Sequence, residues 1–274
     1  MDVGLIGQAH SHRRAVALAN LRRRRLTAVR SVAIVPTYTE AGNIEALCRS
    51  IRVHAPDVGI LVVDDNSPDG TADIVERISV EIGDMTVLRR PGKAGLGAAY
   101  RAGMRTAIDG GAEICVQMDA DFSHDPAEIP NLISAVEHGV DLAVGSRYVP
   151  GGITENWPRK RRMLSRWGNR YASGVLGLAI NDATAGYRAY LSTSLVDKMD
   201  FESVRADGYG FQVEMTHRLV RSGGKIVEIP ITFRDRTLGQ SKMSQNIVQE
   251  ALLLVLKLWI KDRRGRRQRR IQGR

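Results

Sequence analysis

A regular alternation of two kinds of segment constrains the fold of this chain more than any other feature. From Ser31 onward, short runs of apolar, mostly β-branched residues alternate with longer, helix-like segments. Runs such as Ile60-Leu61-Val62-Val63 are apolar on both faces, as a strand covered on both sides must be. With short connections, this alternation predicts an α/β fold with a mostly parallel sheet between helical layers. The predicted strands are 31–35, 59–63, 85–88, 113–118 and 140–144, and the predicted helices are 40–54, 71–82, 95–109 and 126–138.

The pattern changes after residue 145. Residues 157–171 contain six basic residues and no acid, namely Arg159, Lys160, Arg161, Arg162, Arg166 and Arg170. Like charges crowded onto one loop repel each other unless an anion joins them, so we expect an anion-binding loop here. Beyond it we expect a helix ending near Arg221, a strand over 225–229 and an apolar helix over about 244–261.

The net charge of +10 on the 274 residues comes from the two ends of the chain. Residues 1–30 carry +6 and residues 257–274 carry +8, which leaves −4 for the body between them. A mildly acidic body and basic runs without interleaved aromatic residues argue against a nucleic-acid partner. We expect a disordered basic tail over 1–30, one domain over 31–261 and a second basic tail over 262–274.

The sequence predicts neither a membrane-spanning segment nor a reactive cysteine. The longest apolar run, 251–260, is interrupted by Lys257, whereas about 20 residues are needed to cross a bilayer. The two cysteines, Cys48 and Cys115, fall within a predicted helix and a predicted strand. We therefore expect both to be packing residues.

Polar segments follow three of the predicted strands, where ligands bind in open parallel sheets. Asp119-Ala120-Asp121 ends one strand, and two carboxylates at this spacing can share one Mg²⁺ or Mn²⁺ that keeps positions free for phosphates. Asp64-Asp65 ends another, and an acid there can accept hydrogen bonds from a nucleobase or ribose. Residues 36–40 form the third segment. For Asp119-Ala120-Asp121 the alternative is a turn with solvated acids, and for Asp64-Asp65 it is a strand-turn-helix connection without a ligand.

Basic residues supply candidate phosphate ligands. Residues 89–97 form a glycine-rich loop that leads into a predicted helix, and a helix N-terminus favours phosphate. Close helix packing by the glycines explains the same residues equally well. Arg147 follows the fifth predicted strand and, with Arg161, Arg236 and Lys242, can face a metal-bound diphosphate; the alternative for each is a solvated surface residue.

Taken together, these segments resemble the polyprenol-phosphate (dolichol-phosphate) mannose synthases, inverting enzymes of glycosyltransferase family 2 with the GT-A fold. The resemblance spans about residues 31–260. Six motifs carry it, in the family order: VPTYTE at 35–40, VDDNSPDGT at 63–71, KAGLG at 93–97, MDADFSH at 118–124, GSRY at 145–148 and DRTLGQSK at 235–242.

This resemblance implies a role for each matching residue. The implied nucleotide-sugar ligands are Pro36, Tyr38, Glu40, Val63, Asp65, Asp119, Ala120, Asp121, Arg147, Arg236 and Lys242. Asp119 and Asp121 would also hold Mg²⁺ or Mn²⁺, and Arg147, Arg161 and Ser165 would hold the acceptor phosphate. Asp121 and Arg147 are the implied catalytic residues. The implied reaction transfers mannose from GDP-mannose to a polyprenyl monophosphate, giving a β-linked product and GDP.

The acceptor implied by this resemblance also implies a location. A polyprenyl chain stays in the bilayer, so we expect the enzyme at the cytoplasmic face of a membrane, with its last helix and basic tail on an anionic leaflet. The helix can instead pack on the core, and a separate membrane-anchored partner protein is a further possibility. UDP-glucose or UDP-N-acetylglucosamine is the alternative donor. A Rossmann dehydrogenase is disfavoured because residues 36–38 stand where its glycine fingerprint would be.

Overall fold

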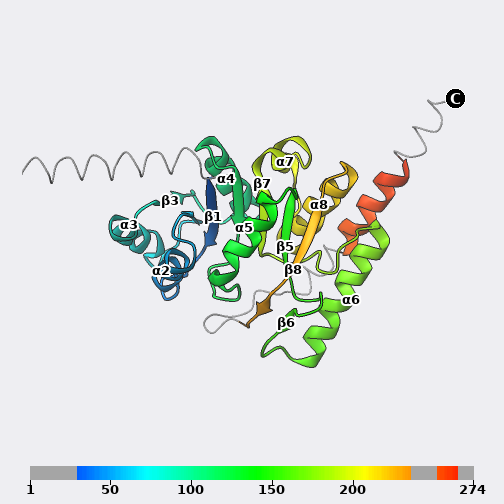
Figure 1. Ribbon diagram of the computed structural model, residues 1–274, viewed down its shortest axis with the longest axis horizontal. Helices are drawn as coiled ribbons and strands as arrows, with labels where there is room; N and C mark the ends of the chain where they lie inside the picture. Colours follow the sequence, from blue (N-terminus) through cyan, green and yellow to red (C-terminus); the bar gives the residue numbers. More distant parts are fainter. Residues whose placement is uncertain (1–29, 236–251, 265–274) are drawn as a thin grey trace, which may run out of the picture.

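The computed structural model describes residues 30–235 and 252–264 (Figure 1). A seven-stranded sheet in the order β3-β2-β1-β4-β7-β5-β8 forms its centre, and a two-stranded parallel sheet, β6-β9, lies beside it. In the large sheet β7 runs antiparallel to both its neighbours, and all other pairings are parallel. The strands are β1 Ser31–Thr37, β2 Gly59–Asp64, β3 Met85–Arg89, β4 Ile114–Gln117, β5 Leu142–Ser146, β6 Ile153–Thr154, β7 Arg188–Leu191, β8 Ile226–Pro230 and β9 Thr232–Phe233.

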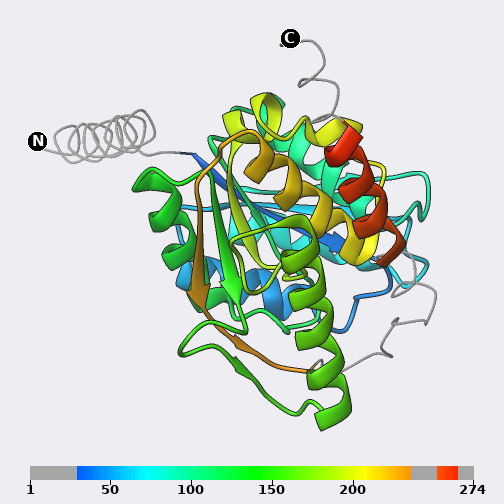
Figure 2. The same cartoon turned by 90° about the vertical axis from the view of Figure 1, so that its right-hand side faces the viewer.

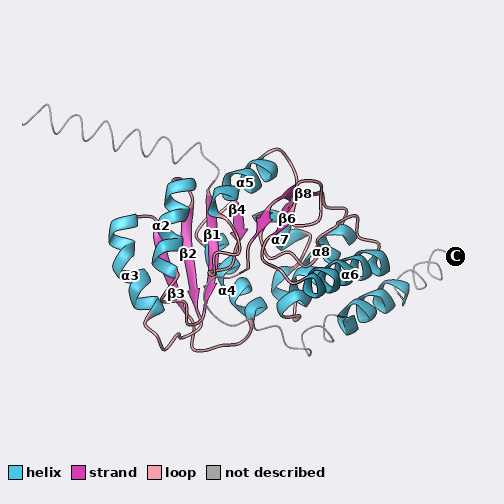
Figure 3. Cartoon of the chain, turned by 90° about the horizontal axis from the view of Figure 1, so that it is seen from below, coloured by secondary structure: helices cyan, strands magenta, loops and turns pink. Residues whose placement is uncertain are grey.

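Helices cover both faces of the large sheet (Figure 3). Buried residues of α2, α3 and α5 pack on one face, and those of α4, α8, the C-terminal part of α6 and the helix 252–264 pack on the other. The helices are α2 Ile44–His54, α3 Thr71–Ile82, α4 Leu96–Asp109, α5 Ile129–Glu137, α6 Arg159–Leu176, α7 Ser192–Asp197 and α8 Gly208–Arg221, with short 3₁₀ turns η1 Pro126–Glu128 and η2 Phe201–Ser203. The helix 252–264 is called the C-terminal helix below.

The strand sequences explain this three-layer arrangement. Along β1, Val32 and Ile34 point into one core cluster, whereas Ala33 and Val35 point into the other. Both faces of the strand are therefore apolar and buried, as a strand between two helical layers requires. The predicted α/β fold with a mostly parallel sheet is confirmed. Both cysteines are buried, as expected for packing residues.

The main correction concerns the basic segment. The expected anion-binding loop is part of α6, whose buried Asn169, Ala172 and Leu176 repeat every three or four residues. The segment is therefore a helix and not a loop, although it still places Arg162, Arg166 and Arg170 four residues apart, where like charges repel each other. The anion-binding part of the expectation stays a prediction. The predicted helix over 126–138 also differs, because it consists of η1 followed by α5.

The ends of the chain bear on the remaining expectations. The tail predicted over 1–30 lies outside the described residues except for Arg30, and so does the first part of the last predicted helix. The C-terminal helix continues through residue 264, past the predicted end at 261. In the described part of the chain no helix is long and apolar enough to cross a membrane.

Candidate active site

The carboxyl ends of β1, β2, β4 and β5 lie at one edge of the sheet, beside a cleft of about 500 Å³. This cleft brings together most of the predicted site residues. Its lining includes Pro36, Tyr38, Glu40, Asp65, Asp119, Ala120, Asp121, Arg147 and Arg161. Val63 is fully buried in the core beneath α4 and does not line the cleft. Arg236 and Lys242 lie outside the described residues.

The two acids that end β2 have different surroundings. Asp64 is buried and builds the loop, accepting hydrogen bonds from the Thr37 hydroxyl at 2.9 Å and from the Ser67 backbone N–H at 2.9 Å. Asp65 lines the cleft and forms an ion pair with Arg90 at 2.5 Å. Burial raises the pKa of Asp65 although Arg90 opposes the effect. Only Asp65 therefore faces a ligand in the cleft.

The Asp-Ala-Asp segment after β4 is held by hydrogen bonds on both sides. Asp119 Oδ1 accepts from the Tyr100 hydroxyl at 3.1 Å, and Asp121 Oδ1 accepts from the backbone N–H of Ser123 at 3.1 Å. Phe122, which lies between Asp121 and Ser123, has a φ of 59°, a left-handed conformation that non-glycine residues rarely adopt. This tight turn keeps both carboxylates at the cleft.

A divalent cation fits these donors. The described residues contain no group of three or more acidic, histidine or cysteine side chains that could hold a metal. Asp119 and Asp121 alone suit Mg²⁺ or Mn²⁺, which usually take one or two carboxylates and complete their shell with water and substrate phosphates. The hydroxyl of Ser123, at the same cleft, is buried without a hydrogen-bond partner in the described structure, and provides a further free oxygen.

His124 stabilises this turn through a hydrogen bond and through contacts of its ring. Its Nδ1 accepts a hydrogen bond from the Asp119 backbone N–H at 3.1 Å, so the neutral ring carries its proton on Nε2. The ring stacks on Tyr187 with centroids 4.8 Å apart and meets the edge of Phe233. Burial lowers the pKa of His124, although the two nearby acids oppose the effect. In the sequence, His124 is marked only as the last residue of the motif at 118–124.

Arg147 is held by a buried ion pair. Its Nε and Nη2 donate to the two carboxylate oxygens of Asp182 at 2.7 and 2.6 Å, and Nη2 also donates to the Thr184 hydroxyl at 3.0 Å. Burial alone would lower the pKa of Arg147, but Asp182 outweighs it and the pKa lies above its usual range. The guanidinium is thus a fixed positive charge in the cleft wall.

The two predicted acceptor residues on α6 lie one turn apart. Arg161 forms an ion pair with Asp235 at 2.8 Å and lies 4.2 Å above the Trp157 ring. The guanidinium of Arg147 lies 5.4 Å from the same ring. Ser165 accepts a hydrogen bond from the Tyr148 hydroxyl at 2.6 Å. Trp157 therefore connects the two arginines, a role that no local pattern in the sequence indicated.

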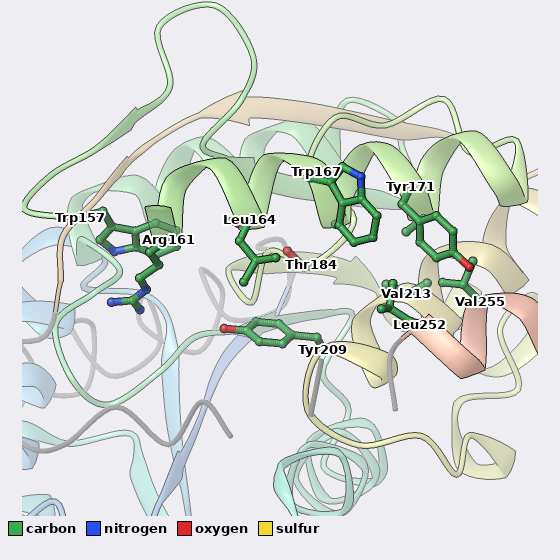
Figure 4. Close-up of a pocket in the computed structure, with 13 residues that line it drawn as sticks. Trp157, Arg161, Leu164, Trp167, Tyr171, Thr184, Tyr209, Val213, Leu252 and Val255 are labelled. Atoms are coloured by element: carbon green, nitrogen blue, oxygen red, sulfur yellow. The ribbon is translucent and has the colours of Figure 1, made fainter. Parts of the chain in front are cut away.

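A second, apolar pocket of about 80 Å³ adjoins the cleft (Figure 4). Trp167 and Tyr171 of α6 form one side, and Leu252 and Val255 of the C-terminal helix form another. Four residues line both the pocket and the cleft, namely Trp157, Arg161, Thr184 and Tyr209. Ser165 lines the pocket but not the cleft. The predicted acceptor residues thus lie where a polar cleft meets an apolar pocket.

The contacts of Asp207 favour close packing over phosphate binding as the role of the glycine-rich loop at 89–97. Its carboxylate accepts a hydrogen bond from the Gly97 N–H at 2.6 Å, at the N-terminus of α4. A side chain at Gly95, where φ is 93°, would collide with this carboxylate. The protein's own acid therefore occupies the helix N-terminus that we considered for phosphate, and the glycines serve close packing.

The comparisons with known proteins agree with this geometry. Residues 32–197 match the family model of Glycosyl transferase family 2. Polyprenol monophosphomannose synthase of Mycolicibacterium smegmatis is 44% identical over 238 residues, which cover 86% of this chain and 89% of that protein. Undecaprenyl-phosphate mannosyltransferase of Micrococcus luteus is 46% identical over 227 residues, which cover 83% and 93%.

A solved structure shares the fold. Glucosyl-3-phosphoglycerate synthase from Mycobacterium tuberculosis, in complex with Mn²⁺, uridine diphosphate and glucosyl-3-phosphoglycerate, superimposes with a TM-score of 0.60 at 19% identity. The superposition covers 84% of this chain and 80% of that one. The predicted GT-A fold and the resemblance carried by the six motifs are thereby confirmed. This chain belongs to glycosyltransferase family 2.

Proposed function

We propose that this enzyme transfers mannose from GDP-mannose to a polyprenyl monophosphate, with inversion at the anomeric carbon and with Mg²⁺ or Mn²⁺. Two relatives that align over most of this chain are named as enzymes that join mannose to a polyprenol phosphate. The products are the polyprenyl-phosphate β-mannose and GDP.

The observation that carries this proposal is the junction of the cleft and the apolar pocket. A polyprenyl phosphate has a dianionic head and a long hydrocarbon chain, and this site offers cations next to apolar side chains. Arg161 lies at the junction, with Arg147 on the cleft side and Ser165 on the pocket side. A water-soluble acceptor such as a sugar has no need of the pocket formed by Trp167, Tyr171 and Val255.

The chemistry follows from the acceptor. The second pKa of a phosphate monoester is about 6, so the acceptor is already an anion at neutral pH and needs no strong base. Its oxygen attacks the anomeric carbon as the bond from that carbon to the diphosphate oxygen breaks, and GDP leaves with the electron pair. Attack from the rear converts an α-linked donor into a β-linked product. Arg147, Arg161 and Ser165 hold the acceptor in line for this displacement.

The leaving group is a diphosphate, and its negative charge grows as the bond breaks. Asp119 and Asp121 would hold the Mg²⁺ or Mn²⁺, which stabilises this charge when bound. Asp65, with Pro36, Tyr38 and Glu40, forms the nucleotide end of the cleft. The amino group of Lys93 lies 4.6 Å above the Tyr38 ring and places a further positive charge at that end.

A membrane lipid acceptor also fixes the place of the reaction. We infer that the enzyme works at the cytoplasmic face of a membrane, bound peripherally. A separate membrane-anchored protein is the other way to bring the cleft to the acceptor.

A transfer assay tests the proposal. Purified protein with Mn²⁺ or Mg²⁺ and a short polyprenyl phosphate is incubated with radiolabelled GDP-mannose, UDP-glucose or UDP-N-acetylglucosamine. We expect label in the lipid fraction from GDP-mannose alone, no transfer after chelation, and loss of transfer in Asp121→Asn but not in the exposed control Asp109→Asn. Transfer only from a UDP-sugar would correct the donor, and donor binding without any transfer would point to a wrong acceptor or to a missing membrane partner.

A further inference from the structure

Asn169 occupies a position of α6 where an apolar residue is expected. The buried residues of this helix are Asn169, Ala172 and Leu176, which share one helix face. The side chain of Asn169 is only 1% exposed. Burying an amide costs free energy unless the amide is hydrogen-bonded, and asparagine is a weaker helix former than alanine or leucine. Packing alone therefore does not explain an asparagine at this position.

The amide of Asn169 joins α6 to the segment that precedes β7. Its Nδ2 donates to the Thr184 hydroxyl at 3.0 Å, and its Oδ1 accepts from the Thr184 backbone N–H at 3.0 Å. Nδ2 also donates to the Ser165 carbonyl, one turn earlier in α6, at 3.0 Å. Both N–H donors of the amide are thus engaged, and so is its oxygen. We call the paired hydrogen bonds between Asn169 and Thr184 the Asn169–Thr184 link.

The Thr184 hydroxyl extends this link to Arg147. Its oxygen accepts from Asn169 Nδ2 and from Arg147 Nη2, each at 3.0 Å. The hydroxyl itself donates to Asp182 Oδ1 at 3.5 Å. A hydroxyl has one proton and two lone pairs, so its hydrogen-bonding capacity is fully used. A single oxygen atom therefore couples the position of α6 to that of the Arg147 guanidinium.

The N-terminal half of α6 depends on this link for its position. None of the residues 159–168 is buried, and Asn169 is the first buried residue of the helix. Figure 2 shows this half of the helix extending past the large sheet, whereas the C-terminal half lies over it. Arg161 and Ser165 belong to the half that extends. The first buried contact of α6 after these two residues is therefore the one with Thr184.

We propose that Asn169 and Thr184 are positioning residues for the acceptor phosphate. They hold Arg161 and Ser165 of α6 in place relative to Arg147, which follows β5. This inference rests on the proposed function, in which these three side chains together bind a phosphate monoester. A reactant misplaced by about 1 Å can react about a hundredfold more slowly. A buried amide and hydroxyl with all these hydrogen bonds made keep two separate segments rigidly in register.

The Thr184 hydroxyl can be removed with little change in volume. Thr184→Val leaves Arg147 Nη2 and Asn169 Nδ2 without this acceptor, whereas Thr184→Ser keeps the hydroxyl. We expect Thr184→Val to raise KM for a short polyprenyl phosphate roughly tenfold or more, because hydrogen bonds that involve a charged group are lost. The Kd of GDP, measured by calorimetric titration, should stay the same. Thr184→Ser should restore most of the acceptor KM, which a general loss of stability would not predict.

Asn169→Leu breaks the link from the other side. We expect the same selective rise in KM for the acceptor. Combining it with Thr184→Val should add little further loss, because residues that act through one link are not additive. The matched control is Ser173→Ala, which removes a hydrogen bond from the same helix to the Ile180 carbonyl at 2.7 Å. This control should leave the acceptor KM and the Kd of GDP unchanged.

Hydrogen exchange without substrate tests the link independently of turnover. Residues 163–168 should exchange faster in Thr184→Val and in Asn169→Leu than in the wild type, and at the wild-type rate in Ser173→Ala. Unchanged exchange in both variants, or an equal loss of acceptor and GDP binding, would overturn the inference. Absence of transfer by the wild-type protein would count against the proposed function instead, because the exchange measurement needs no reaction.

Discussion

Neutralising Asp182 should leave an unpaired cation in the wall of the cleft. The Asp182 side chain is fully buried and that of Arg147 is 5% exposed. Breaking a buried pair by removing one partner costs about 3–5 kcal/mol. Because Asp182→Asn keeps the size of the side chain, this cost comes from charge and not from a cavity. A domain of this size loses about 2–4 °C of Tm per kcal/mol, so we expect Tm to fall by about 6–20 °C.

A double variant separates the structural role of the pair from the proposed catalytic role of Arg147. In Arg147→Met with Asp182→Asn, both charges are gone, and the Asn amide oxygen can still accept from the backbone N–H of residue 147, which donates to Asp182 at 3.0 Å. Replacing a buried pair by uncharged residues of similar volume is often neutral. We therefore expect the double variant to regain at least half of the lost Tm, measured by calorimetry, and to remain inactive in the transfer assay.

Two results would refute this reasoning. A fall in the free energy of unfolding of less than about 1 kcal/mol in Asp182→Asn would mean that the buried charge is compensated elsewhere. Activity in the double variant close to that of the wild type would mean that Arg147 only stabilises the fold and does not hold the acceptor phosphate.

Three further changes test other parts of the site. Asp121→Ala should abolish turnover and weaken metal-dependent donor binding in calorimetric titrations; near-normal rates would remove Asp121 from the metal site. Arg161→Ala should raise KM for the lipid phosphate at least tenfold and leave donor affinity intact, and an equal loss of both would contradict its acceptor role. Asp262→Asn should speed hydrogen exchange of residues 252–264 and raise KM for the acceptor, unlike Asp109→Asn. Burial alone would raise the pKa of Asp262, but hydrogen bonds from His217 and Arg221 outweigh burial and lower it. The stabilisation that the Asp262 carboxylate gives to the C-terminal helix is therefore present above pH ~4 and is lost as the pH falls further.

The sequence predicted the parts of the site that depend on strand ends. Asp65, Asp119 and Asp121 each follow a strand, and the parallel sheet brings the ends of those strands together. The strands β1 and β2 are longer than their apolar runs, because backbone pairing continues through polar residues, as in the register of Thr37 with Asp64, whereas β4 is shorter than predicted. The side chain of Val63, by contrast, does not line the cleft. Its position along β2 points its side chain toward Gly103 of α4 and away from the cleft.

Contacts between distant segments could not be predicted from local patterns. Asp207 binds the amide of Gly97 from 110 residues away, and Asp182 binds Arg147 from 35 residues away. Both acids stand in polar segments that look like ordinary turns. Their roles follow only from the packing of α4, α8 and β5, which the hydrophobic pattern of one chain does not specify.

The antiparallel strand β7 has a consequence for synthesis of the protein. Once Gln117 has been made, the ribosome has supplied the four strands β3, β2, β1 and β4. The edge of β4 that is not paired with β1 pairs with β7, and β7 also pairs with β5. Arg188, the first residue of β7, follows Gln117 by about seventy residues. At about 5–20 residues per second, the ribosome needs about 4–14 s to supply it. During this interval an unpaired, apolar strand edge is open to pairing with other chains, so we expect the nascent protein to depend on chaperone protection until β7 arrives.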